Sequence, residues 1–233
     1  TINSKLSLSH TTTGAVAIGA APQATTKSIT SYLGKVGEEQ SDITTKYAGT
    51  TAIDYTYYYY SATNQIAGAS VNTFLKTSQT QSTLARPTTA GTADLNTRSI
   101  TAYLGAVGYE QSDITTKYAG TTAIDYTHYY YGATKLQAGA VANSALVMSQ
   151  TQKTSATRPT AETITDNTKS ITYYKGDATL EQSDYTVKYA NSAVVDYTAY
   201  YYDVSGTATR ANAGTTINSK LSLSHTTTGA VAI

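Results

Sequence analysis

Residues 27–60 read KSITSYLGKVGEEQSDITTKYAGTTAIDYTYYYY, and versions of this stretch occur three times in the chain. Residues 98–131 match it at 29 of 34 positions, and residues 169–202 form a more diverged third copy. The copies begin 71 residues apart, at Lys27, Arg98 and Lys169. Self-similarity at a fixed period is typical of repeat architectures. The sequence therefore predicts three modules of one kind.

A longer periodicity encloses the three copies. Residues 1–18, TINSKLSLSHTTTGAVAI, recur unchanged as residues 216–233, an offset of 215 that is close to three times 71. One interpretation is a window cut out of frame from a longer array. The other is duplication of a strand, so that one end completes the fold opened at the other. The expected divisions are the end of a preceding repeat (1–22) and three β modules (23–87, 88–159 and 160–233, the last including the start of the next repeat).

Alternation of apolar and polar residues predicts the strands of one module. In the first copy we expect strands at 28–33, 41–48, 52–60 and 71–77. The last has counterparts at 142–148 and 217–223, and a short Ala-rich helix is the alternative in copies one and two. Stretches rich in turn residues, such as 83–96 and 154–167, vary between copies and are expected to be surface linkers.

Composition favours an all-β protein. Thr supplies 46 of the 233 residues and Tyr 22, and both fit a pleated surface. A module of 71 residues buries only a small core, so neighbours should support one another. We expect three tandem antiparallel β-sandwich-like modules of about 71 residues, with a continuous β-solenoid as the alternative.

The charge and apolar content exclude several classes of partner. Only 13% of residues are charged and the net charge is +1, which argues against nucleic acid as a partner. No run of eighteen apolar residues occurs, so no membrane span is expected. The chain has no cysteine, which excludes disulfides and thiolate metal sites.

Tyrosine clusters recur at residues 57–60, 129–131 and 200–202. Because neighbouring strand residues point to opposite faces, some rings should fill the core and others should face outward. Outward rings could pack between modules or stack on a ligand such as a glycan. The candidates for stacking are Tyr58, Tyr60, Tyr129, Tyr131, Tyr200 and Tyr202.

Each module also repeats a set of carboxylates. Hard cations prefer several oxygen ligands, so calcium between modules is one hypothesis for them. The spacing fits no calcium-loop pattern, and ion pairs with Lys46, Lys117 and Lys188 are the simpler interpretation. The candidate carboxylates are Glu39, Asp42, Asp54, Glu110, Asp113, Asp125, Glu181, Asp184 and Asp196.

An isopeptide cross-link is a sharper hypothesis for the same lysines. A buried Lys beside an Asn and a carboxylic acid can form a spontaneous amide, as in pilin-like domains of bacterial surface proteins. The candidate pairs combine Lys46, Lys117 and Lys188 with Asn72, Asn143 and Asn218.

Catalysis finds little support in the sequence. His10 and His225 occupy one position of the longer repeat, and His128 is the third histidine. No nucleophile elbow, phosphate loop or two-histidine metal motif occurs. Three diverged copies of one module are also unlike a single active site. We therefore expect a protein that is not an enzyme and holds no cofactor, apart from the calcium considered above.

Residues 43–51, ITTKYAGTT, resemble the I-T-K-x-Y-D-G-T-T core of Ig-like repeats in large bacterial surface proteins, with Ala48 in place of the family's Asp. In the third copy the match weakens, because Tyr189-Ala190-Asn191-Ser192 stands there. The resemblance implies an extracellular or cell-surface location in an adhesin or fibre stalk. The expected partners are neighbouring copies, head to tail. The alternative function is an adhesive module that binds glycans or another cell surface.

Overall fold

The computed structural model describes residues 4–14, 21–154, 156–211, 216 and 219–229. These residues form one antiparallel sheet of 15 strands and contain no helix. The prediction of an all-β protein is confirmed. In this part of the chain there is consequently no helix long and apolar enough to cross a membrane.

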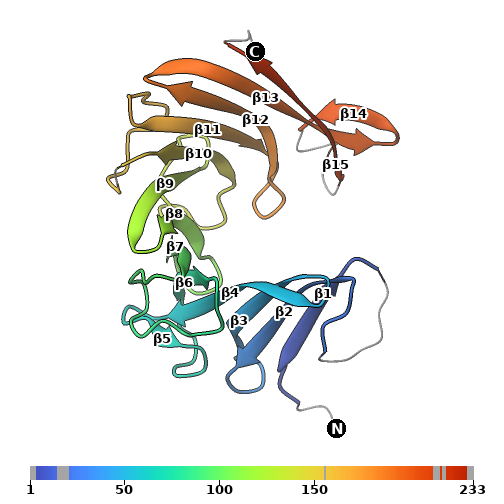
Figure 1. Cartoon of the computed structure of the whole chain (residues 1–233), viewed down its shortest axis with the longest axis vertical. Helices are drawn as coiled ribbons and strands as arrows, with labels where there is room; N and C mark the ends of the chain where they lie inside the picture. The colour runs from blue at the N-terminus through green and yellow to red at the C-terminus, as the bar shows by residue number, and fades with distance from the viewer. Residues whose placement is uncertain (1–3, 15–20, 155, 212–215, 217–218, 230–233) are drawn as a thin grey trace. The chain divides into compact units, whose positions relative to one another are not determined.

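The chain divides into two compact units, which are described separately. Unit 1 comprises residues 1–110 and 117–123. Its hydrogen-bonded strand order is β1-β2-β3-β4-β6-β7, with β5 beside the end of β4 (Figure 1). Its strands are β1 (Leu8–Thr12), β2 (Thr26–Leu33), β3 (Gln40–Ala48), β4 (Thr51–Tyr60), β5 (Gln65–Ile66), β6 (Leu75–Gln81) and β7 (Thr97–Leu104).

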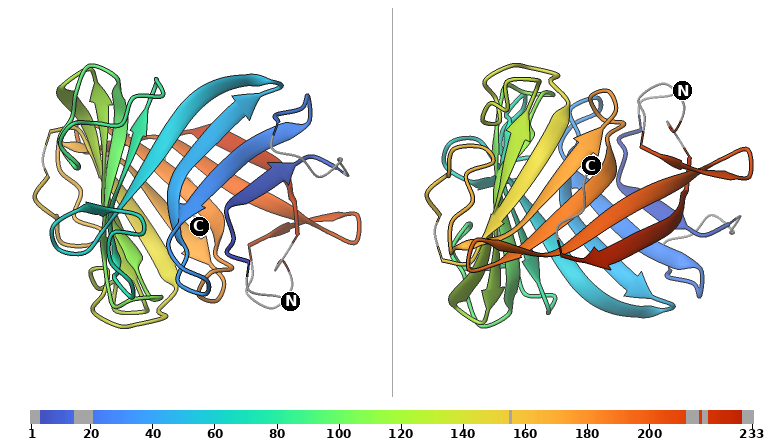
Figure 2. Two further views of the ribbon diagram at one scale, coloured as in Figure 1. Left: turned by 90° about the horizontal axis from the view of Figure 1, so that it is seen from below. Right: turned by 90° about the horizontal axis from the view of Figure 1, so that it is seen from above.

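Unit 2 comprises residues 111–116 and 124–233. Its strand order is β8-β9-β10-β11-β12-β13, and β13 pairs with both β14 and β15. The β13–β14 hairpin, orange in Figure 2, extends beyond β12. The strands are β8 (Gln111–Ala119), β9 (Thr122–Tyr131), β10 (Leu146–Gln152), β11 (Thr168–Lys175), β12 (Gln182–Ala190), β13 (Ala193–Val204), β14 (Thr207–Arg210) and β15 (Leu221–Thr228), with residues 117–123 of β8 and β9 assigned to unit 1.

The arrangement of the strands differs from the expected sandwich. A β-sandwich packs two sheets face to face, whereas all described strands belong to one sheet. The solenoid alternative is also wrong, because a β-solenoid stacks parallel rungs and the ladders within each unit are antiparallel.

Three of the four strands expected in the first copy are confirmed, and the fourth begins four residues later than expected. In the first copy it runs over 75–81 rather than 71–77, because Asn72 adopts a left-handed turn conformation with φ of 51°. Asn143 has φ of 55° and β10 likewise starts later than expected. The alternative of a short helix is wrong at both places. In the third copy β15 begins at Leu221, and residues 217–218 lie outside the described part.

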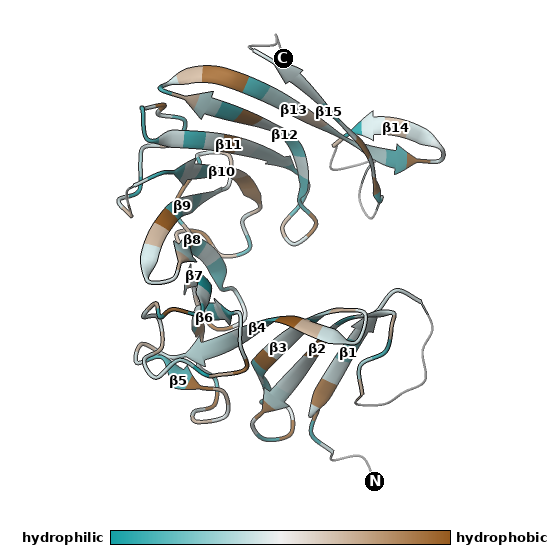
Figure 3. Ribbon diagram, viewed as in Figure 1, coloured by the Kyte–Doolittle hydropathy of each residue, from teal (hydrophilic) through white to brown (hydrophobic). Residues whose placement is uncertain are grey.

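Many of the buried side chains on one face of the sheet are polar. Gln79 of β6 is fully buried; its amide donates to the Thr92 carbonyl at 2.9 Å, and its oxygen accepts from the Gly91 amide at 3.1 Å. The loop between β6 and β7 is thereby held on the sheet, since buried backbone groups need partners. The expected surface linker therefore covers the core. Figure 3 shows the same polarity, with brown limited to short stretches of the strands.

The opposite face of the strands carries rows of hydroxyl groups. In unit 1, Thr30 and Thr44 are joined at 2.8 Å between their Oγ1 atoms, and Thr56 and Thr80 at 2.9 Å. The Tyr58 hydroxyl lies 3.1 Å from Thr44 Oγ1. These hydroxyl rows follow cross-strand neighbours, which is why their side chains meet. The rows are Ser9, Thr30, Thr44, Thr56 and Thr80 in unit 1, and Ser149, Thr172, Thr186, Thr198 and Thr226 in unit 2.

Candidate functional site: contacts between successive repeats

A glutamate of each sequence copy accepts a backbone hydrogen bond from a residue at, or just before, the start of the strand that precedes the copy. Glu39 accepts from the Leu6 amide at 3.0 Å, Glu110 from Leu75 at 3.0 Å and Glu181 from Leu146 at 2.8 Å. Hydrogen bonds from its own backbone amide and from Leu6 hold the pKa of Glu39 below its usual value. This glutamate is the first residue of a Glu-Gln-Ser-Asp motif that recurs at residues 39–42, 110–113 and 181–184, and it therefore anchors the neighbouring repeat.

A cation at the start of each later copy reaches back to the preceding one. Arg98 Nε lies 2.5 Å from the carboxylate of Asp54 on β4. Lys169 on β11 pairs in the same way with Asp125 on β9. Each pair bridges the strand between its partners, β6 or β10, because β7 and β11 lie next to those strands. Lys27 and Asp196 occupy the equivalent positions, and no ion pair of either is found within the described residues.

A second kind of ion pair holds the loop between β6 and β7, called the covering loop of the first copy, on the sheet. The Arg86 guanidinium donates to Asp42 of β3 at 2.5 Å and lies over the ring of Tyr57, 4.7 Å from its centroid. Burial raises the pKa of Tyr57 and of Tyr59, and the charge of Arg86 opposes the shift. A cation over an aromatic face is favourable, more so when shielded from water.

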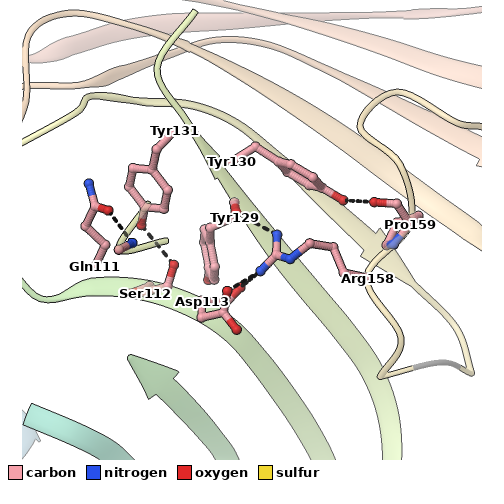
Figure 4. A network of polar contacts seen from close by, with 9 residues as sticks. Gln111, Ser112, Asp113, Tyr129, Tyr130, Tyr131, Arg158 and Pro159 are labelled. Carbon is pink, nitrogen blue, oxygen red and sulfur yellow. Dashed lines mark hydrogen bonds and ion pairs between the residues drawn. The ribbon is translucent and has the colours of Figure 1, made fainter. Parts of the chain in front are cut away.

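The second copy repeats this arrangement, which Figure 4 shows in unit 2. Arg158 donates to the Asp113 carboxylate, and also to the carbonyls of Asp113 and Tyr129 at 2.8 Å each. The guanidinium carbon lies 5.0 Å from the Tyr130 ring centroid, and the Tyr130 hydroxyl donates to the Pro159 carbonyl at 2.7 Å. One arginine therefore joins the loop to two strands.

In the third copy the arginine comes from another part of the chain. Arg210 ends β14, and its Nε donates to Asp184 of β12 at 2.7 Å. The β13–β14 hairpin thus replaces the covering loop as the source of the cation. Sequence reasoning missed all three arginines. The Arg-Pro pairs at Arg86 and Arg158 were an available signal, and Arg210 has no such mark.

All the proposed calcium ligands except Asp196 are engaged in these contacts. The Glu-Gln-Ser-Asp glutamates hold backbone amides, and five aspartates form ion pairs with Arg86, Arg98, Arg158, Lys169 and Arg210. The expected lysine partners were wrong: Lys46 lies opposite Asp54 on the ladder, but the ion pair of Asp54 is with Arg98. Within the described residues no three acidic or histidine side chains form a group that could hold a metal.

The first candidate isopeptide pair, Lys46 and Asn72, lies at opposite ends of a strand. Gln40 at the start of β3 donates to Thr73, next to Asn72, whereas Lys46 lies six residues along the strand. Six residues of strand span about 20 Å. Lys46 and Asn72 are therefore too far apart to react. Lys188 lies six residues from Gln182, which donates to the Ser219 carbonyl, and Asn218 is outside the described part. Lys117 lies on β8, and Asn143 in the loop before β10.

The tyrosines proposed for stacking are mostly structural. Tyr60, Tyr131 and Tyr202 are buried and donate to the carbonyls of Ser41, Ser112 and Ser183 at 2.9–3.0 Å. They were expected to face outward and do not. Tyr58, Tyr129 and Tyr200 are half-buried, with hydroxyls 3.1–3.3 Å from the Oγ1 atoms of Thr44, Thr115 and Thr186.

The three histidines lie on different strands. His10 Nε2 of β1 is 2.7 Å from Thr26 Oγ1, and His225 lies on β15 opposite Ala199. His128 is buried on β9, where the first copy has Tyr57. Comparison of the chain with protein-family models, with curated proteins and with solved structures found no match.

Proposed function

We propose that this chain is a structural repeat unit of an extracellular fibre, filament or adhesin stalk. The three sequence copies act in it as tandem modules of about 71 residues within one sheet. The recurrence of the same contacts between successive copies carries the proposal. A carboxylate of the glutamate motif holds the preceding strand three times, and a cation reaches back to an aspartate twice.

Such contacts suit an element that carries load along its length. Each copy is supported by its neighbour, so stability accumulates along the array rather than within one module. The chain reaches this without cysteine, through buried amide and hydroxyl hydrogen bonds and partly buried ion pairs. The resemblance of residues 43–51 to Ig-like repeats of bacterial surface proteins supports the extracellular location.

A longer chain tests the proposal. Because residues 216–233 repeat residues 1–18, adding residues 19–233 after Ile233 continues the longer repeat in register. In a nearest-neighbour array the urea midpoint of unfolding should rise in the extended chain, with a larger denaturant slope. A control chain joins the two segments through a flexible Gly/Ser linker inserted after Ile233.

The readout is circular dichroism in urea for the original, extended and linker chains. A higher midpoint for the extended chain than for the linker chain supports a continuous structural array. Equal midpoints for all three would show that copies do not support one another across the junction, and the proposal would fail.

A further inference from the structure

The strands β1 and β15 have the same sequence but use opposite edges. Residues 6–13 and 221–228 both read LSLSHTTT. Within the described residues β1 pairs only with β2, with His10 opposite Ile29. In that same part of the chain β15 pairs only with β13, with His225 opposite Ala199. Figures 1 and 2 show β1 beside β2 and β15 beside β13.

The strand β6 shows what one such segment does with both edges. Its Gln79 lies opposite Tyr57 on β4 and opposite Ile100 on β7. Ile100 corresponds to Ile29, and Tyr57 corresponds to Ala199, by the 71-residue spacing of the copies. β1, through His10, therefore has the pairing that β6 makes with β7. β15, through His225, has the pairing that β6 makes with β4. A single LSLSHTTT strand fits between β13 and β2.

We infer that β15 of one molecule takes the place of β1 on β2 of a second copy, so that molecules join head to tail by strand exchange. The inference rests on the proposed structural role and names its partner, a second copy of this chain. The register follows from β1: His225 lies opposite Ile29 of the second copy, and Leu223 opposite its Ser31.

The exchanged strand finds the same polar partners that β1 has. The Leu6 amide donates to Glu39, and the Leu221 amide is its counterpart. Ser9 Oγ lies 2.9 Å from the Tyr32 hydroxyl, a contact that Ser224 reproduces. Residues 221–228 have the same sequence as residues 6–13 and meet the same partner residues on the second molecule. When β15 replaces β1, the side chains of the segment therefore keep all their contacts.

The exchange also completes an ion pair. Arg98 with Asp54 and Lys169 with Asp125 each bridge one strand between two copies. Asp196 on β13 and Lys27 on β2 stand in the same relation across β15 once β15 lies against β2 of a second molecule. The tethered β1 competes through its high effective concentration, so the joined form should increase with protein concentration.

Engineered cysteines in the full chain test this inference, since the chain has none of its own. Leu8 lies opposite Ser31, and Leu223 is the counterpart of Leu8. Cross-strand Cα distances of about 4.5–5.5 Å lie within the range of a disulfide. The test variant carries S31C and L223C. The control variant carries S31C and L8C, which should lock β1 onto β2 within one molecule.

The expected result for S31C/L223C after mild oxidation is a ladder of disulfide-linked oligomers whose linked peptides join residues 31 and 223. The control S31C/L8C should stay monomeric with an internal disulfide, and each single variant should stop at dimers. An S31C/L223C chain that stays reduced, or that forms the bond only within one molecule, overturns the exchange. The urea test of the extended chain uses a single molecule, so it decides the structural role separately.

Discussion

Arg210 binds Asp184 from a hairpin strand, whereas Arg86 and Arg158 bind the equivalent aspartates from loops that follow the last strand of their copy. An arginine thus binds the equivalent aspartate in all three copies, but in the third copy it comes from a different element of the chain. The third copy obtains its arginine from its own β13–β14 hairpin. The loop after β1, which follows the other LSLSHTTT segment, contains no arginine.

Substitution of Arg210 should weaken unit 2. Arg210→Met leaves the Asp184 carboxylate, 7% exposed, without its cation. Loss of hydrogen bonds to a charged group at such a site costs about 1–3 kcal/mol of unfolding free energy. Urea denaturation followed by circular dichroism measures it. Arg98→Met is the matched control: that side chain is 58% exposed, so its pair with Asp54 should contribute about 1 kcal/mol or less. Equal losses would contradict the assignment.

The strand pattern was predictable because the first three strands of each copy are amphipathic. Ile43, Ile53 and Tyr57 alternate with polar residues, and the period of two marks such strands directly. The fourth strand of the first copy begins later than its pattern predicts because its buried face consists of polar residues, Thr77, Gln79 and Gln81. A glutamine in a sequence is normally predicted to be exposed to solvent. The burial of Gln79 can be understood only when the loop that hydrogen-bonds to its side-chain amide is known.

The candidate site was less predictable for a related reason. Glu39 was recognised as a recurring carboxylate, but its partner is a backbone amide of Leu6, which carries no sequence signal. The arginines that bind Asp42 and Asp184 lie 44 and 26 residues away in the chain, so no local spacing links them. The single sheet arises because strands of successive copies pair with one another. The sequence pattern within one copy does not predict this pairing.

The turn between β2 and β3 should distinguish two glycines. Gly34 has φ of 124°, and a Cβ there would lie 2.6 Å from the Glu38 carbonyl oxygen. Gly34→Ala should therefore cost about 2 kcal/mol or more, through both backbone strain and the clash. Gly37 has φ of 79° with open space around a Cβ, so Gly37→Ala should cost only about 1 kcal/mol. Thermal or urea unfolding compares the pair, and equal costs would show that the turn relaxes.

Alkaline pH should destabilise the fold through its buried tyrosines. Burial raises the pKa of Tyr185 to about 12, and also raises the pKa of Tyr60, Tyr130 and Tyr202. A raised folded pKa contributes stability that is complete below the unfolded value of 10.0 and is lost as the pH rises through the folded value. Unfolding free energy should thus fall from pH 10 to pH 12. Urea titrations across this range measure it, with tyrosinate absorbance as the probe of ionisation. An unfolding free energy that does not change between pH 10 and pH 12 would contradict the burial of these tyrosine hydroxyls.

Acid should loosen β1 through Glu39. The pKa of Glu39 is lowered in the folded protein, so its contribution to stability is present above the ordinary glutamate value of 4.5 and is lost as the pH falls through the folded pKa. Amide exchange of Leu6, corrected for the intrinsic rate, should accelerate on acidification. In Glu39→Gln, which does not titrate, the same correction should give a protection of Leu6 that is insensitive to pH in this range. Equal pH dependence in both proteins would show that another group governs the strand.

The hydroxyl rows predict equal effects at equivalent threonines. Thr44 joins Thr30 and Tyr58 in unit 1, and Thr186 joins Thr172 and Tyr200 in unit 2. Valine keeps the shape and strand preference of threonine but removes the hydroxyl, so Thr44→Val and Thr186→Val should each cost about 0.5–1.5 kcal/mol. Thr→Ser at the same sites keeps the hydroxyl but loses a methyl group and some strand preference. If Thr44→Ser and Thr186→Ser cost as much as the valine variants, packing rather than the hydrogen-bonded row holds these strands. Unequal costs at Thr44 and Thr186, measured by urea unfolding, would show that the two copies use the row differently.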